Sequence, residues 1–104
     1  MTTYLVTYHG AMGPPPSDEA REQMMSAFMQ WAASVGDGMV DPGSPLGRSK
    51  VVTSEGDTDG NADGQIGGYT IIKADSLADA VSAVRAHPFL TRGGTLQVSE
   101  AVAP

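Results

Sequence analysis

The chain has 104 residues, a formal net charge of −6 at pH 7, 40% hydrophobic residues and no cysteine. The missing cysteines exclude disulfides, thiol nucleophiles and cysteine-ligated zinc, and six lysines and arginines are too few to favour a nucleic-acid partner. The length predicts one domain, residues 1–104, and the short apolar runs predict a cytoplasmic protein with no membrane partner.

The first third of the chain predicts a strand, a stiff turn and a helix. Residues 4–8 form a short β-rich run, and the prolines at 14–16 cannot continue it. Ser17 is a typical N-cap, and Gly36 is a natural stop for a helix over residues 18–35. The apolar face of this helix consists of Met24, Phe28, Trp31 and Val35.

The middle of the chain predicts two further strands. Residues 38–47 read as a short extended piece followed by a loop bounded by prolines. The second strand is expected at residues 49–53 and the third at residues 68–74. The acidic, glycine-rich segment 55–64 is expected to join them as an irregular hairpin loop.

The last third predicts a second helix and a final strand. Ser76, with Asp79 three residues later, resembles a capping box, and the helix that follows has an apolar stripe. His87, before Pro88, is expected to end this helix and to interact with its dipole. Residues 95–100 alternate in polarity, as strands do.

The resulting order, βαββαβ, predicts an α+β, ferredoxin-like fold with an antiparallel sheet and both helices on one face. Adjacent apolar residues at 5–6, 51–52 and 71–72 suggest that both faces of the sheet are apolar there. Two helices cover only one face, so we expect a second copy to cover the other. The expected assembly is a homodimer with its sheets face to face, a dimeric α+β barrel.

The stretch DGNADGQI, residues 59–66, contains the weak metal-site candidates Asp59, Asn61 and Asp63. In the register of a calcium loop, the position that requires a bidentate glutamate is Thr70. Acidic and glycine-rich turns need no ion, so a solvated loop is the favoured reading and a weak cation site the alternative. We therefore expect no metal and no cofactor.

Candidate chemistry is sparse, because the chain lacks hydrolase, phosphate-loop and dinucleotide motifs. His9, at the end of the first strand, is the candidate acid/base or polar pocket group, with Asp41 as its partner. The alternative readings are a partly exposed strand-end residue for His9 and a turn residue before Pro42 for Asp41. Candidate ligand-pocket residues are Tyr69, Trp31, Phe28 and Met24, and the last three are equally expected in the core.

Three blocks in order resemble the YCII-related, DGPF-domain family. They are VDPGSPLGRSKVV (residues 40–52), GGYTIIKADSLADAV (67–81) and HPFLTRGGTLQVSEA (87–101). The resemblance implies a dimeric α+β barrel. Relatives pair a carboxylate near the end of strand one with a histidine on the first helix, but here the strand ends in His9 and the helix offers Met24, Met25 and Phe28, so this dyad does not transfer.

Two functions follow from the resemblance. The first is a small enzyme or ligand-binding barrel that carries out cofactor-free proton transfer on a small organic molecule. The alternative is a non-catalytic regulatory module that associates with an extracytoplasmic-function sigma factor. Fold analogy alone does not choose between them.

Overall fold

A computed structural model describes residues 1–10, 17–60 and 66–102. The strands and helices alternate along the chain as the βαββαβ order predicts, with a hairpin inserted between the second and third strands of the main sheet. The elements are β1 (Thr2–His9), α1 (Asp18–Val35), the 3₁₀ turn η1 (Gly36–Gly38), β2 (Met39–Pro45), β3 (Lys50–Thr53), β4 (Gly56–Asp59), β5 (Ile66–Ala74), α2 (Leu77–Val84), α3 (Pro88–Thr91) and β6 (Thr95–Glu100).

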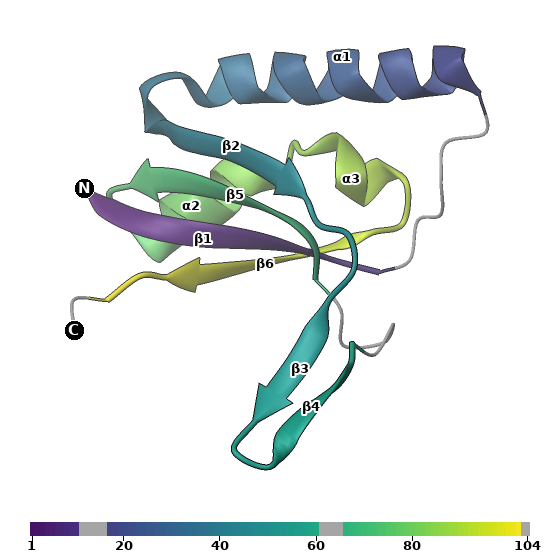
Figure 1. Cartoon of the computed structure of the whole chain (residues 1–104). Helices are drawn as coiled ribbons and strands as arrows, with labels where there is room; N and C mark the ends of the chain where they lie inside the picture. Colours follow the sequence, from purple (N-terminus) through teal and green to yellow (C-terminus); the bar gives the residue numbers. More distant parts are fainter. Residues whose placement is uncertain (11–16, 61–65, 103–104) are drawn as a thin grey trace.

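The main sheet is antiparallel and has the strand order β2-β5-β1-β6, so the ferredoxin-like prediction is confirmed (Figure 1). The two central strands, β1 and β5, alternate in burial along their length. The even-numbered side chains of both strands face the helices, and the odd-numbered ones, including the buried Thr7, point to the other face, which we call the outward face. The helix-facing core joins strand residues Tyr4, Val6, Ile72 and Ala74 to helix residues Trp31, Ala80 and Val84.

Capping explains where both long helices begin. The side chain of Ser17 accepts a hydrogen bond from the amide of Ala20 at 3.0 Å, and that of Ser76 accepts one from the amide of Asp79 at 3.1 Å. The predicted stop of the first helix is confirmed, because Gly36 has φ +64°. Trp31 ties α1 to α2 by donating its indole N–H to the carbonyl of Ala83 at 2.9 Å.

The second strand of the sheet was assigned wrongly from sequence. It is β2, which contains Pro42 and Pro45 and shows two register shifts against β5. Proline is tolerated here because β2 lies at the edge of the sheet, where one row of backbone groups needs no partner. Residues 50–53 instead pair with β4 in a separate hairpin, so part of the expected loop 55–64 is a strand.

The outward face has a small apolar centre. Leu5 is 38% exposed and pairs with the half-buried Ile71 on one side and with Ser99 on the other. Val51 and Val52 belong to the hairpin, so they do not contribute to this sheet as predicted. Among the described residues, no helix combines the length and hydrophobicity needed to cross a membrane.

Gly43 offers a test of how closely β2 approaches β5. Its φ is +78°, and a Cβ there would collide with the carbonyl oxygen of Tyr69, whereas Gly93 has φ +83° and open space around it. We expect Gly93→Ala to cost about 1–2 kcal/mol for the backbone conformation alone. Gly43→Ala should cost roughly 1–3 kcal/mol more because of the added steric conflict. Urea unfolding, followed by the emission of the buried Trp31, measures both, and equal losses would contradict the close approach.

Candidate functional site

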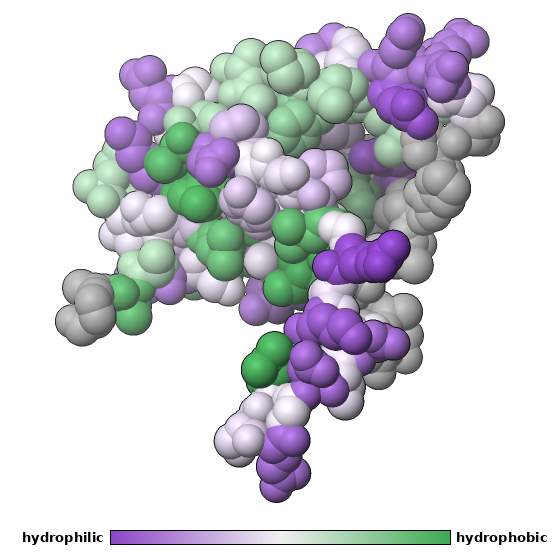
Figure 2. All heavy atoms as spheres, viewed as in Figure 1, coloured by the Kyte–Doolittle hydropathy of each residue, from purple (hydrophilic) through white to green (hydrophobic). Residues whose placement is uncertain are grey.

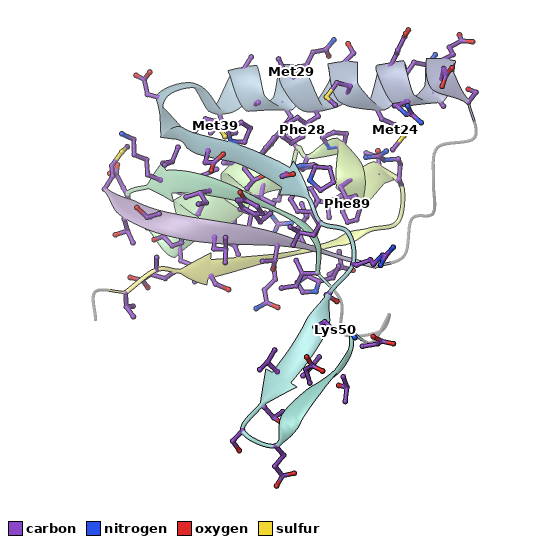
Figure 3. All side chains as sticks on the ribbon, in the orientation of Figure 1. Met24, Phe28, Met29, Met39, Lys50 and Phe89 are labelled. Carbon is purple, nitrogen blue, oxygen red and sulfur yellow. The ribbon has the colours of Figure 1, made fainter. Side chains whose placement is uncertain are left out.

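A cavity of about 360 Å³ lies between α1, the end of β2 and the start of β5. Figure 3 shows Met24 and Phe28 on the side of α1 that faces the sheet. The volume is within the roughly 300–1,000 Å³ typical of small-molecule sites. The lining residues are Tyr8, Arg21, Met24, Met25, Phe28, Pro42, Gly43, Ser44, Pro45, Gly67, Gly68 and Tyr69.

The lining is mostly apolar, with few polar side chains. Arg21 contributes a guanidinium from the first turns of α1, and Tyr8 contributes a phenol from the end of β1. Met24, Met25 and Phe28 form an adaptable apolar wall, because methionine is unbranched and fills irregular space. A cavity of this kind suits an apolar ring that carries one or two polar substituents.

A chain of hydrogen bonds runs through Tyr8. Its hydroxyl lies 2.8 Å from Thr70 Oγ1 and 2.6 Å from Nε2 of His87. The hydroxyl of Thr70 donates to the carbonyl of Pro42 at 2.9 Å, and Nδ1 of His87 accepts from the amide of Phe89 at 3.0 Å.

The two ends of this chain of hydrogen bonds determine which group donates and which accepts in each bond. The carbonyl of Pro42 only accepts, so the hydroxyl of Thr70 donates its one hydrogen to it. Thr70 must therefore accept from Tyr8. The amide of Phe89 only donates, so neutral His87 carries its proton on Nε2 and donates it to the Tyr8 oxygen. The phenol of Tyr8 therefore retains one free lone pair.

His87 is held neutral by its surroundings. Its side chain is 2% exposed, with the Trp31 ring centroid 4.3 Å away and that of Phe28 5.7 Å away. Burial, together with a smaller effect of the positive charge of Arg92 in the same direction, lowers the pKa of His87 to about 4. Burial also raises the pKa of Tyr8, while its hydrogen bond with Thr70 acts in the opposite sense.

The sequence predicted that His87 ends the second helix, and this prediction is wrong. Helix α2 ends at Val84, and His87 is the N-cap of the short helix α3, with Pro88 in its first turn. Its imidazole takes the capping role usually filled by a serine or aspartate oxygen. Apart from the proline that follows, no feature of the sequence indicates this role.

The structure does not bring His9 and Asp41 together. Nε2 of His9 lies 2.8 Å from the hydroxyl of Thr7, and the Asp41 carboxylate accepts from the amide of Gly43 at 2.8 Å. Asp41 pairs with Ile71, which pairs with Leu5, four residues before His9. Two strand spacings of about 4.8 Å and four residues at about 3.3 Å separate their Cα atoms by roughly 16 Å.

The predicted ligand-pocket residues divide between the cavity and its surroundings. Met24 and Phe28 line the cavity, and Tyr69 contributes to it from β5. Tyr69 pairs with Thr7, so its ring points to the outward face. Trp31 lies in the core against His87 and is not among the lining residues.

The weak metal candidates gain no support from the described residues. The carboxylate of Asp59 is exposed and pairs with the ammonium of Lys50 at 2.6 Å. Asn61 and Asp63 lie outside the described residues. Within the described part of the chain, no group of three or more potential metal ligands occurs.

The depressed pKa of His87 predicts a specific loss of stability in acid. The unfolded chain binds a proton near pH 6.5, but the folded chain does so only near pH 4, so folding stability falls as pH drops through this window. The loss attributable to His87 should reach up to about 3 kcal/mol. Urea unfolding at several pH values should show a shallower dependence for His87→Gln than for the wild type.

His9→Gln is the matched control, because His9 is the other histidine of the chain and is more exposed. His87→Asn separates the two bonds of the ring, since asparagine can cap α3 but does not reach Tyr8. An unchanged pH dependence in both His87 variants would contradict a neutral, buried imidazole.

The fold is similar to that of a solved structure, and a family model matches the sequence. The search of curated proteins found no match. Among solved structures, the chain is similar to 5-chloro-2-hydroxyhydroquinone dehydrochlorinase (TftG) from Burkholderia phenoliruptrix AC1100, in complex with 2,5-dihydroxybenzoquinone. The TM-score is 0.52 at 18% sequence identity, over 91% of this chain and 90% of the other, which shows a shared fold. A family model described as the YCII-related domain matches residues 4–100, so the chain belongs to the YCII-related domain family.

Proposed function

We propose that the cavity beside Tyr8 binds a small, ring-containing organic molecule with an acidic oxygen substituent. The observation that carries the proposal is a mostly apolar cavity whose wall includes a phenol anchored by a buried, neutral histidine. Because Thr70 and His87 fix the phenol from two directions, its free lone pair has a defined orientation. A preorganised acceptor of this kind binds a ligand hydroxyl at little entropic cost.

The size of the cavity supports a single substituted ring. An apolar cavity of about 150 Å³ is enough for benzene, so about 360 Å³ leaves room for ring substituents. The methionines at 24 and 25 and Phe28 supply apolar contacts to the faces of a planar ring.

The charge of the lining supports an acidic substituent. Arg21 is the charged residue among those that line the cavity, and it is a cation in a chain of net charge −6. A guanidinium matches the geometry of a carboxylate, attracts a phenolate by its charge, and remains charged at all relevant pH values. The proposed ligand therefore presents its anionic oxygen to Arg21 and a hydroxyl to Tyr8.

The direction of the protons favours binding over proton transfer by His87. A neutral His87 whose proton lies on Nε2 can take a second proton only on Nδ1, which already accepts from the Phe89 amide. Burial and the charge of Arg92, which lower the pKa of His87 to about 4, also oppose its protonation. The similar TftG is an enzyme, which is compatible with small-molecule chemistry in this fold, and a role of His9 in proton transfer stays a prediction.

The alternative function, association with a sigma factor, has no support from the family or structural comparisons. The homodimer remains the expected assembly, because the outward face of the sheet is uncovered in the single chain.

Titration with 4-hydroxybenzoate, which carries a carboxylate and a neutral hydroxyl, and with benzoate, which lacks the hydroxyl, followed by amide chemical shifts, tests the site. We expect shifts to centre on α1 and on residues 42–45 and 67–69. Tyr8→Phe should weaken the binding of 4-hydroxybenzoate roughly threefold to tenfold, the value of one hydrogen bond, and leave that of benzoate nearly unaffected. Arg21→Gln should weaken both anionic probes about twofold to fivefold.

Two control variants match these changes. Arg85→Gln removes an exposed arginine that does not line the cavity, and Met29→Ala shortens an exposed methionine on α1. Both should bind like the wild type. Shifts confined to the outward face, together with loss of binding in His9→Ala, would move the site away from the cavity and would refute the proposal.

A further inference from the structure

The two edge strands of the main sheet, β2 and β6, differ in their protection against pairing with a further strand. Strand β2 contains Pro42 and Pro45, and its register against β5 shifts twice. Prolines and irregular register are features that prevent an edge strand from adding another strand. Strand β6 contains no proline and no lysine, and its register against β1 is unbroken. The edge at β6, which Figure 1 shows at the margin of the sheet, is therefore open.

The contacts of β6 with β1 identify the backbone groups that face this open edge. The amide of Ala101 donates to the carbonyl of Thr3 at 2.9 Å, and the carbonyl of Gln97 lies 3.5 Å from the hydroxyl of Thr7. Successive residues of a strand direct their backbone groups to opposite sides, so residues 97, 99 and 101 face β1. Residues 96, 98 and 100 therefore present their N–H and C=O groups to the open edge.

An apolar hollow of about 310 Å³ lies beside this edge, on the helix side of the sheet, and is called the edge groove below. Leu96 and Val98 line it from β6, and Leu77, Val81 and Leu90 line it from α2 and α3. Leu77 is 48% exposed and Leu90 is 36% exposed. Residues 96 and 98 thus direct their backbone groups to the open edge and their side chains into the edge groove. This combination suits an extended segment, because a strand supplies both ladder hydrogen bonds and alternate side chains.

The charges near the edge groove differ between its two ends. Strands β5 and β6 both run antiparallel to β1, and α2 returns the chain between them, so Arg85 after α2 lies toward the start of β6. Arg85 is the charged residue among those that line the groove, and within the described part of the chain it makes no ion pair. Glu100, at the end of β6, is the one charged residue of this strand. In Figure 2 the strongly hydrophilic residues gather instead along the β3–β4 hairpin and at the start of α1.

We propose that the open edge of β6 binds an extended peptide segment of another protein, which adds to the sheet as an antiparallel strand. The segment places apolar side chains in the edge groove, a basic residue beside Glu100 and an acidic residue beside Arg85. In strand addition of this kind, main-chain hydrogen bonds supply affinity and side-chain pockets supply specificity. Strand β6 of a second copy fits less well, because it carries its own α2 and α3 on the same face, where the hollow has room for side chains but not for helices.

Hydrogen exchange tests the open edge without any ligand. We expect the amides of residues 96 and 98 to exchange at least about a hundredfold faster than those of residues 97 and 99, which are bonded to β1. Protection of residues 96 and 98 in the free protein would show that the edge is already covered and would overturn the proposal.

Titration with the acetylated and amidated peptide Thr-Lys-Thr-Leu-Thr-Val-Thr-Glu, followed by amide chemical shifts, tests binding. In the expected register its lysine lies opposite Glu100, its leucine opposite Val98 and its valine opposite Leu96. N-methylation of the leucine removes a donor directed at β6, so binding should weaken at least about tenfold. N-methylation of the threonine after the leucine is the matched control, because that N–H points away from β6, and it should weaken binding less than about threefold.

Variants of the protein test the groove and the charge separately. Leu77→Glu places a charge in the edge groove and should weaken the peptide more than about tenfold, while a glutamate in the first turn of α2 is compatible with the helix. Leu46→Glu is the matched control, because Leu46 is 45% exposed and lies outside the groove. Arg85→Gln should weaken the peptide about twofold to fivefold but leave a peptide that ends in glutamine unaffected. Near-ultraviolet circular dichroism checks that each variant keeps its fold.

Three results of these titrations would overturn the proposal: no shifts along β6 at millimolar peptide, equal effects of the two N-methyl groups, or shifts centred on the cavity beside Tyr8. Protection of residues 96 and 98 that grows with protein concentration and is lost in Leu77→Glu would assign the edge to a second copy, which also contradicts it. The edge groove shares no lining residue with the cavity beside Tyr8, so the ligand titration proposed for that cavity succeeds or fails independently.

Discussion

The hydrogen-bond chain from the Phe89 amide to the Pro42 carbonyl is the constraint on which the candidate site depends. A group that only donates stands at one end and a group that only accepts stands at the other, so the orientation of every hydroxyl and imidazole between them is determined. Reversing any one bond would leave a buried polar group without its partner, which costs about 1–3 kcal/mol. The polarity of the site is therefore a property of the folded chain before any ligand arrives.

This chain of hydrogen bonds also joins parts of the molecule that are distant in sequence. It connects β1 through Tyr8, β5 through Thr70, β2 through Pro42 and α3 through His87. Strand β2 has an interrupted register against β5 because of its prolines, and the side-chain bond from Thr70 holds it where the ladder is irregular. The same irregular segment forms one wall of the cavity, so the bond that stabilises the edge strand also shapes the site.

The cavity adjoins the base of the β3–β4 hairpin. Residues 42–45 precede this hairpin and residues 67–69 follow it, and both segments line the cavity.

The sequence by itself determined the elements with strong local signals: the helix limits at Ser17, Gly36 and Ser76, the alternating central strands, the βαββαβ order and the family. These follow from capping groups and from periodicity, which act over a few residues. The tertiary structure alone decided which edge segment joins the sheet and that His87 caps α3 against Tyr8. The choice of β2 over residues 50–53 depends on pairing with β5, and the burial of His87 depends on Trp31, 56 positions away in the chain. Contacts of that range leave no periodic trace in the sequence, because burial and hydrogen-bond partners arise only once the strands and helices have packed.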